Sequence, residues 1–466
     1  MIICLCEPIE LLLPGAGSPI TSLVSLLSRA LRERTFKKIV TMAVQTTSDR
    51  PRKLAGYDFY HQILGSPKLI VAPMVDQSEL AWRILSRRYG AQLCYTPMIN
   101  AKMFSPPSAH AYRAQAFNTS CLEEGSNTHD RPLIVQFCAN NPSQLLTSAL
   151  AVQDHCDAVD INLGCPQDIA RKGHYGSFLM DEWELIHDLI NTLHENLSVP
   201  VTAKFRIFSS IEKTVAYAKM LESAGAQILT CHGRLRTQRG QNTGLADWAH
   251  IKAVKKAVQV PVFANGNILF HEDIAKCLKE TGVDGVMSAE GQLYNPALFA
   301  PASSGNLSST LTGAHPPHAD LALEYLAIVK TLKTPTSTSA VKGHLFKIMH
   351  PALSRETDLR ERLGRIRGSN VIEEYVEVAK EMKERMERDA AEVMKEGLKI
   401  DDLITIEPTT GLRVLPHWLS QPYFRPLKSP TEASKRPSSP IPISHEDVKR
   451  ARLSGQSAVR DIDISL

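Results

Sequence analysis

One cysteine of this chain stands in a setting that suits chemistry better than packing. Cys165 follows an apolar, β-branched run at 158–161 and lies between Gly164 and Pro166. Glycine allows unusual backbone dihedral angles, and proline disfavours helix at the residue before it, so we expect the thiol on a loop at a strand end. Free cysteines are most often buried structural groups. This context and the basic loop at 171–174 favour a thiol that takes part in chemistry.

Polar or flexible residues also follow the ends of the other apolar runs. They are Ala72, Pro73 and Met74, then Gln136, Asn162, Lys204, Arg206, His232 and Arg234, and finally Asn265, Gly266, Asn267, Ala289, Glu290 and Gly291. Asp160 and Glu290 are the carboxylates near these ends, which gives little support to a glycosidase. The set has no cluster of histidines and carboxylates suited to a metal ion, so we expect no metal site.

An amide, a lysine, a histidine and two glycine-bearing loops together suit flavin mononucleotide (FMN). Its phosphate needs backbone N–H groups such as those near Gly266 and Gly291, because loops after the seventh and eighth strands of a barrel commonly bind phosphate. The edge of its ring that gains negative charge on reduction needs a cation, for which Lys204 is suited. Gln136 can hydrogen-bond the ring, and residues 73–74 offer an apolar shelf beneath it.

These residues are positioned by strands that alternate with helices. Eight apolar runs are predicted strands, at 68–74, 92–96, 133–137, 157–162, 200–205, 227–231, 261–264 and 285–288. Helical spacing of apolar residues predicts helices at 78–89, where Ser78 is a candidate N-cap, and at 142–155, 181–196, 211–223, 247–257 and 271–280. Residues 105–131 are predicted to be irregular. The alternation predicts an α/β fold, a (β/α)8 TIM barrel whose strand ends meet in one cup.

An open, doubly wound sheet is the competing fold. It usually has a glycine-rich turn after its first strand, and residues 72–74 carry none. We therefore place the FMN-binding barrel at 66–300. A Ser/Gly/Pro/Thr-rich linker follows at 301–317, and helical periodicity at 318–332, 340–349 and 372–397 predicts a small helical domain over 318–397.

Both ends of the chain are expected to lie outside the folded domains. Residues 1–65 are predicted to be a largely disordered N-terminal extension, and residues 398–466 a disordered, basic and proline-rich tail. The start at 1–41 has presequence-like basic and serine residues, but its acidic residues favour a plain extension over mitochondrial import. Basic clusters at 435–452 suggest a bipartite nuclear signal, so we expect the cytoplasm, the nucleus or both.

Composition adds only broad limits. The 466 residues carry a formal net charge of +4, which permits a nucleic-acid partner without arguing for one. Nine cysteines without a CxxC pair indicate a reducing compartment. No apolar run reaches the length of a transmembrane helix, so we expect no membrane partner. We also expect a monomer.

Taken together, the strand-end motifs resemble those of the tRNA-dihydrouridine synthases. The matching runs are APM at 72–74, INLGCP at 161–166, KFR at 204–206, CHGR at 231–234, ANGN at 264–267 and AEGQLYNP at 289–296. The resemblance covers about 66–300 strongly and the helical domain loosely. Within the family, the runs at 171–180 and 288–296 resemble eukaryotic members that modify positions 16 and 17 of the tRNA D-loop. Bacterial members commonly have a Gly-Arg pair where Ala289 and Glu290 stand here, so a backbone contact to phosphate is expected instead.

The resemblance implies an FMN-dependent oxidoreductase that uses NADPH, or NADH, to reduce the C5–C6 double bond of uridine in tRNA. Cys165 would be the proton donor to C5. The residues implied to hold FMN are Ala72, Pro73, Met74, Gln136, Lys204, His232, Asn265, Gly266, Asn267, Ala289, Glu290 and Gly291. Asn162, Arg171, Lys172, Arg206 and Arg234 are candidates for the uracil or the RNA.

The target base would have to leave its stack to reach the flavin. The helical domain would add basic surface for the tRNA body through Lys342, Lys347, Arg360, Arg362, Arg365 and Arg367. Two other functions remain open from the sequence. One is an FMN-dependent dihydropyrimidine or dihydroorotate type of dehydrogenase acting on a small molecule. The other is an RNA-binding barrel that has lost catalysis.

Overall fold

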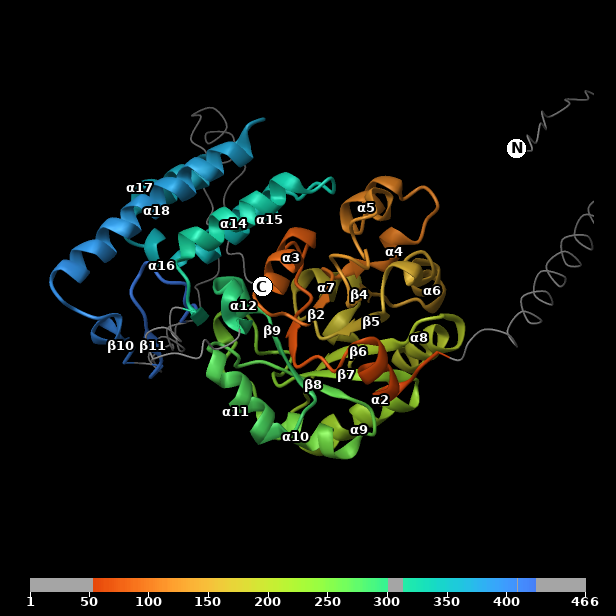
Figure 1. The fold of residues 1–466 in the computed structure, drawn as a ribbon. Coiled ribbons are helices and arrows are strands. Elements are labelled where there is room, and N and C mark those ends of the chain that lie inside the picture. The colour runs from red at the N-terminus through yellow and green to blue at the C-terminus, as the bar shows by residue number, and fades with distance from the viewer. Residues whose placement is uncertain (1–52, 301–312, 409, 425–466) are drawn as a thin grey trace, which may run out of the picture. The chain divides into compact units, whose positions relative to one another are not determined.

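The computed structural model describes residues 53–300, 313–408 and 410–424, which are coloured in Figure 1. The presequence-like start at 1–41, most of the predicted linker at 301–317 and the basic clusters at 435–452 lie outside these residues. The barrel and the helices that follow it belong to one compact unit.

Eight parallel strands form a closed barrel, which confirms the predicted (β/α)8 architecture. Each strand pairs with its neighbour in chain order, and the last pairs with the first, with Ile70 opposite Met287. A short additional strand, β3 (Ile99–Asn100), follows β2 after a break and pairs with β4. The barrel strands are β1 (Leu69–Val71), β2 (Leu93–Tyr95), β4 (Leu133–Cys138), β5 (Ala158–Leu163), β6 (Val201–Arg206), β7 (Ala226–His232), β8 (Val262–Asn265) and β9 (Gly285–Ser288).

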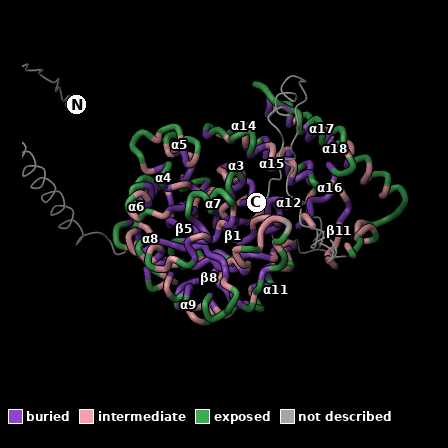
Figure 2. The backbone as a smooth tube through the Cα atoms, turned by 180° about the vertical axis from the view of Figure 1, so that it is seen from behind, coloured by how far each residue is buried: buried purple, intermediate pink, exposed green. Residues whose placement is uncertain are grey.

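The strands are buried on both faces. Nearly every strand residue is buried, and Figure 2 shows the strands in purple with exposed residues on the surrounding helices. This is the physical reason why the strands read as continuous apolar runs, because helices cover the outside and side chains fill the inside of such a barrel. The polar residues near the carboxyl ends of the strands therefore stand out against an apolar background.

The six predicted outer helices are present with shifted ends. They are α3 (Leu80–Arg88), α6 (Pro142–Leu150), α8 (Trp183–Asn196), α9 (Ile211–Ser223), α10 (Trp248–Ala257) and α11 (His271–Thr281). The prediction that Ser78 caps α3 is wrong, because Glu79 is the N-cap residue. The Ser78 hydroxyl instead accepts a hydrogen bond from the Met74 backbone N–H at 3.0 Å, which folds the loop after β1 onto itself.

Two stretches are more regular than the sequence predicts. The segment 105–131 contains α5 (His110–Ala116) and a 3-10 turn (Thr119–Cys121), and α4 (Ala101–Phe104) precedes it. Residues 54–65, predicted as part of a disordered extension, form α2 (Gly56–Asp58) and a π-helical turn (Phe59–Ile63). Phe59 and Tyr60 are buried, and the Tyr60 hydroxyl donates to the Asp284 carbonyl at 3.0 Å. Because β9 begins directly after Asp284, these rings cover the amino-terminal end of the barrel, and the polar composition around them hid this packing.

A helical domain follows the barrel, as predicted, with two helices that the sequence did not reveal. Its helices are α14 (His318–Thr331), α15 (Thr338–Ile348), α16 (His350–Leu353), α17 (Thr357–Arg365) and α18 (Val371–Lys395). α16 was missed because its four residues are too few to show a helical period, and α17 because it is mostly charged or polar. α14 packs against both α3 and α18, so it joins the helical domain to the barrel. Among the described helices, none is long and apolar enough to cross a membrane.

The first part of the predicted disordered tail is folded. A hairpin of β10 (Thr405–Ile406) and β11 (Arg413–Val414) precedes buried residues Leu415, Trp418 and Leu419. The Ser420 hydroxyl donates to the Asn295 side chain at 3.0 Å, which ties this segment to the end of the barrel. A few apolar residues among many prolines are enough to dock the segment up to residue 424, and this is a correction to the prediction for 398–424.

A buried ion-pair network fixes α3 to the long segment before β4. The Arg83 guanidinium is fully buried and donates to both carboxylate oxygens of Asp130, at 2.7 and 2.6 Å, and to Glu124 at 3.3 Å. It also donates to the Ser78 carbonyl at 2.9 Å, so it stabilises the loop that follows β1. Burial by itself would lower the pKa of Arg83, but the Asp130 carboxylate outweighs this effect and the pKa is raised.

We predict that Asp130→Ala will destabilise the protein by about 3–5 kcal/mol, because it leaves the Arg83 charge buried without its main partner. Urea denaturation followed by circular dichroism measures the change. Glu361→Ala, which removes an exposed ion pair with Arg365, is the matched control and should change stability little. Equal effects of the two substitutions would contradict this account.

Candidate active site

The loop after β5 presents Cys165 at the carboxyl end of the barrel. Asn162, on the strand, accepts hydrogen bonds from the backbone N–H groups of Gly164 at 3.1 Å and Cys165 at 2.9 Å. Its own amide donates to the Gln136 side chain at 2.8 Å. The loop continues through α7 (Asp168–Gly173) and a 3-10 turn (Gly176–Leu179). Asn162 was predicted to contact substrate, and the structure places its side chain against the backbone that carries the thiol.

The Cys165 thiol is held in an apolar corner. It packs against a small buried cluster of Cys138, Ala170 and Tyr175, against which Met98 and Phe178 also pack. Burial raises the pKa of the Cys165 thiol, and the positive charges of nearby Arg206 and Lys204 reduce this effect only in part. The group is therefore a protonated thiol at neutral pH, which suits a proton donor better than a nucleophile.

Three arginines hold the carbonyl groups of this loop. Arg206 donates from Nε to the Gly164 carbonyl at 2.8 Å, and Arg239 donates to the Pro166 carbonyl at 2.9 Å. Arg236 donates to the Ser177 carbonyl at 3.1 Å. Arg236 and Arg239 come from the segment between β7 and α10, and sequence reasoning missed both. A sequence signal existed in the density of arginines at 234–239, but nothing in it indicated that their partners lie after β5.

A buried polar network lies beneath the thiol loop. Gln136 donates to the Asp160 carboxylate at 2.8 Å, and the Thr202 hydroxyl donates to the other oxygen of Asp160 at 2.6 Å. Burial raises the pKa of Asp160 to about 6, and the hydrogen bonds and the Lys204 charge oppose this rise. Two hydrogen-bonding groups of the Gln136 side chain are therefore occupied within the protein. Its carbonyl oxygen accepts from Asn162, and one of its N–H groups donates to Asp160.

Lys204 differs from these buried polar groups because its charged end has no hydrogen-bond partner among the described residues. Its side chain is on β6 next to Asn162 in the strand register, and the residue is only 9% exposed. Its ammonium forms no hydrogen bond or ion pair with another described residue. Burial and the Arg206 charge lower its pKa to about 8, while Asp160 opposes the shift. Lys204 therefore remains a cation at pH 7, although its charge has no direct partner.

His232 and the loop after β8 lie on the next strands. Arg234 donates to the His232 Nε2 at 3.0 Å and to the Asn267 side chain at 3.1 Å. Burial and the surrounding cations lower the pKa of His232 well below its ordinary value, so the ring is neutral and carries its proton on Nδ1. Asn267 also binds the backbone of Ala246 in both directions, at 2.9 and 2.8 Å. Arg234 and Asn267 thus shape the site rather than extend freely from it.

Close backbone packing explains the glycines of these loops. Gly266 has φ +116°, and a Cβ atom there would lie 2.6 Å from the Ala246 Cβ. A Cβ atom at Gly291 would lie 2.3 Å from the Ile268 carbonyl oxygen. The Asn265 side chain donates to the Met287 carbonyl at 3.0 Å and joins β8 to β9. The two loops therefore keep their backbones close to one another at the end of the barrel.

The loops after β1 and β9 lie side by side because these strands pair. The Ala72 N–H donates to the Ser288 carbonyl at 3.0 Å, and Pro73 and Met74 follow directly. Ala289 is the N-cap residue of α12 (Glu290–Tyr294), and a 3-10 turn (Pro296–Phe299) follows it. The predicted set at 72–74 and 289–291 is thus brought to one edge of the barrel mouth.

Some predicted contact residues lie elsewhere. Arg171 and Lys172 are on α7 and exposed, and Arg171 pairs with Asp168 at 3.3 Å. Among the basic residues assigned to the tRNA body, Arg360, Arg365 and Arg367 are exposed, and Arg362 pairs with Glu381. The prediction for Lys347 is wrong, because this residue is buried between α15 and the barrel and cannot form part of an outer surface.

No group of three or more His, Cys, Asp or Glu within the described residues could hold a metal ion.

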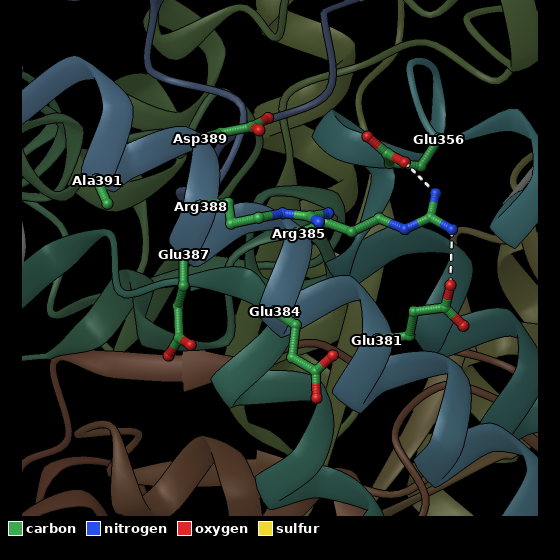
Figure 3. A pocket seen from close by; sticks show the side chains of 8 residues that line it. All are labelled: Glu356, Glu381, Glu384, Arg385, Glu387, Arg388, Asp389 and Ala391. Atoms are coloured by element: carbon green, nitrogen blue, oxygen red, sulfur yellow. Dashed lines mark hydrogen bonds and ion pairs between the residues drawn. The ribbon is translucent and has the colours of Figure 1, made fainter.

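A pocket on the helical domain is lined mostly by acidic side chains, in contrast to the cations at the barrel mouth. Figure 3 shows its lining residues, which are Glu356, Glu381, Glu384, Arg385, Glu387, Arg388, Asp389 and Ala391. Acidic side chains outnumber basic ones, and Arg385 is already bound to Glu356, Glu381 and Asp358. A polyanion is disfavoured on this side of α18.

Comparison with known proteins gives a consistent match. Residues 70–387 match the family model described as dihydrouridine synthase. The tRNA-dihydrouridine(16/17) synthase, NAD(P)(+), of Saccharomyces cerevisiae is 47% identical over 419 residues, which cover 86% of this chain and 96% of that protein. A protein of Mus musculus named as similar to that enzyme is 48% identical, covering 83% of this chain and 74% of its own length. The Schizosaccharomyces pombe enzyme is 46% identical, covering 83% and 94%.

We predict that Gly176→Ala will displace the Cys165 loop. Gly176 has φ +65°, and a Cβ atom there would lie 2.8 Å from the Cys165 carbonyl oxygen. Gly282→Ala is the matched control, because Gly282 has φ +72° and open space around it, so it should cost only the backbone strain of about 1–2 kcal/mol. Thermal unfolding and the alkylation rate of Cys165 distinguish the two. The prediction fails if Gly176→Ala leaves that rate unchanged.

The pH dependence of Cys165 alkylation by iodoacetamide tests its raised pKa. The thiolate is the reacting form, so a raised pKa moves the midpoint of the rate profile above the ordinary value of 9.0. The chain unfolded in urea serves as the control and should titrate near the ordinary value. Peptide mass spectrometry assigns the modified cysteine. A midpoint below 9 in the folded protein would refute the raised pKa of Cys165.

Proposed function

This chain belongs to the dihydrouridine synthase family, and from that premise we propose that it reduces the C5–C6 double bond of uridine in tRNA, with FMN as cofactor and NADPH as reductant. We further propose the D-loop, at positions 16 and 17, as its target. The names of the yeast and fission-yeast relatives support this choice, since both are tRNA-dihydrouridine(16/17) synthases.

One observation carries the FMN proposal. Lys204, near the carboxyl end of β6, holds a buried ammonium that forms no hydrogen bond or ion pair with another described residue. Leaving such a charge unpaired costs free energy, and an anionic ligand group would recover it. The neutral His232 adds an N–H donor at Nδ1 on the neighbouring strand. These groups fit the flavin's ring edge, which gains negative charge on reduction.

The proposed cofactor-binding residues follow from these positions. Lys204 and His232 would bind FMN directly, with Pro73 and Met74 beside the ring and the backbones at 265–267 and 289–291 near the phosphate. When bound, FMN supplies the transfer of a hydride from NADPH to C6 of the uracil. The Gln136 and Asn162 side chains, which are largely occupied within the protein, would instead fix the floor of the site.

Cys165 completes the reaction as the proton donor. Reduction of the double bond requires a hydride equivalent at C6 and a proton at C5. The thiol would transfer its proton to C5, and the resulting thiolate would recover a proton from water. The raised pKa of the thiol supports this role, because it keeps the proton bound until the ring has become electron-rich. The loop held by Asn162 and the three arginines would place the sulfur at a constant position.

The tRNA would lie on the side of the helical domain that carries exposed arginines. Arg360 and Arg367 are exposed and form no ion pair with another described residue. The acidic side chains around the pocket on α18 would repel the tRNA backbone (Figure 3). Backbone binding through such groups should weaken as salt concentration rises.

The visible spectrum of the purified protein and the dihydrouridine content of unmodified tRNA after incubation with NADPH test the proposal. Flavin absorbance and new dihydrouridine in the D-loop are expected together. Flavin absorbance with turnover of free pyrimidines instead of tRNA would replace the proposal with a small-molecule dehydrogenase. A colourless protein that still binds tRNA would overturn the redox function.

In the same assay we predict that Cys165→Ala will keep its bound FMN and will still oxidise NADPH slowly. Its rate of dihydrouridine formation should fall by at least about 10²-fold, the usual range for removal of a general acid. Cys121→Ala, which removes a partly exposed thiol outside the site, should behave as wild type. Loss of flavin from Cys165→Ala would instead show that the thiol is structural.

A further inference from the structure

One face of α15 is pressed against the beginning of α3. The His344 Nε2 lies 3.0 Å from the Glu79 carboxylate, and its ring stacks on Trp82 with centroids 3.9 Å apart and planes within 7°. The Tyr325 hydroxyl donates to the other Glu79 oxygen at 2.7 Å. The nearby charge of His344 lowers the pKa of Glu79 against its burial. These contacts fix the position of α15 relative to the barrel.

Lys347 lies on the same face, one turn further along the helix. The residue is only 8% exposed, and its ammonium donates to the Gln77 side-chain oxygen at 2.9 Å and to the Gly343 carbonyl at 3.5 Å. Both partners are neutral, and Lys347 forms no ion pair with any residue that the structure describes. Burial lowers its pKa to about 8, and the charge of Glu290 opposes this shift. The helical domain thus carries a desolvated cation without an anionic partner at bonding distance.

The ammonium lies at the edge of the barrel mouth. Gln77 belongs to the loop after β1, three residues beyond Met74, and Glu290 directly follows Ala289 after β9. These two strands pair with one another, and α12 packs against α15. Lys347 is therefore placed above the two adjacent loops that carry residues 72–74 and 289–291. Its location distinguishes it from a lysine buried by chance within the helical domain.

We propose that Lys347 is a phosphate-binding residue that the helical domain contributes to the barrel site. The proposal rests on the proposed function, since FMN and tRNA are the phosphate-bearing ligands of that reaction. The phosphate belongs either to the flavin or to the tRNA backbone next to the target base. Lysine binds phosphate as a compact point charge, and its three N–H groups leave a donor beyond those bound to Gln77 and Gly343.

The charges around this edge favour such a residue. The side chain at 290 is a carboxylate, which would repel a phosphate bound by the backbone at 289–291. Lys347 is the cation on which the Glu290 charge acts, so it offsets this repulsion. The Lys204 and Arg206 side chains extend from β6, on the other side of the closed barrel from β1 and β9. Arg234 lies beside the loop after β8, where it donates to Asn267, and Lys347 is a cation placed at the loops after β1 and β9.

Release of FMN and of riboflavin, which lacks the phosphate, tests the proposal on the full chain. The protein is reconstituted with each flavin, and release is followed by fluorescence for wild type, Lys347→Gln and the control Lys380→Gln. Lys380 is an exposed lysine of the same domain, so its substitution changes net charge equally. If the flavin phosphate is the ligand, Lys347→Gln releases FMN at least tenfold faster and leaves riboflavin release unchanged.

Binding of unmodified tRNA at several salt concentrations distinguishes the second source. If Lys347 binds a tRNA phosphate, Lys347→Gln weakens tRNA binding at least tenfold and reduces the salt slope by about one, with FMN release unchanged. Wild-type behaviour in both assays overturns the proposal. If Lys347→Gln does not fold, Lys347→Met takes its place, because methionine suits a buried position. Lys347→Arg keeps the positive charge and should therefore retain the preference for FMN over riboflavin. A wild-type protein that binds neither FMN nor tRNA would overturn the proposed function itself.

Discussion

The pairing of β1 with β9 is the constraint on which the arrangement of the site depends. It closes the barrel, and it brings the loop at 72–79 next to the loop at 289–291 although more than 200 residues separate them in the chain. The hydrogen bond from Ala72 to Ser288 extends this pairing into the loops. Without closure, the polar residues at the strand ends would lie along an edge and would not surround a common space.

Several cationic side chains of the site are buried, and they differ in how many hydrogen-bond partners they have within the protein. Arg206 and Arg234 donate to backbone carbonyls, a histidine nitrogen and an amide, so their charges also hold the loops in place. Lys204 has no such partner among the described residues, which is the basis for proposing that it binds an anionic ligand group. Arg206 and Lys204 also limit the rise in the pKa of Cys165. Arg206 therefore both holds the loop of the thiol and affects its pKa.

The helical domain is docked on the barrel through both polar and apolar contacts. Glu79, Trp82 and the neighbouring Gln292 come from the barrel, and Tyr325 and His344 come from α14 and α15. This interface is the reason why Lys347 lies at the loops after β1 and β9. The pocket on α18 is lined mostly by acidic side chains and is disfavoured for a polyanion.

The sequence by itself determined the barrel, the order of its strands, and the position of Cys165, Lys204 and His232 at strand ends. It could do so because buried parallel strands require continuous apolar runs, against which a polar residue is conspicuous. It did not reveal that Phe59 and Tyr60 cover the barrel, that residues 415–424 are docked, or that Arg236 and Arg239 hold the Cys165 loop. These features depend on contacts between distant segments, which have no periodicity along the chain. The burial of Lys347 was decided in the same way, since it requires the packing of α15 against the loop after β1 and against α12.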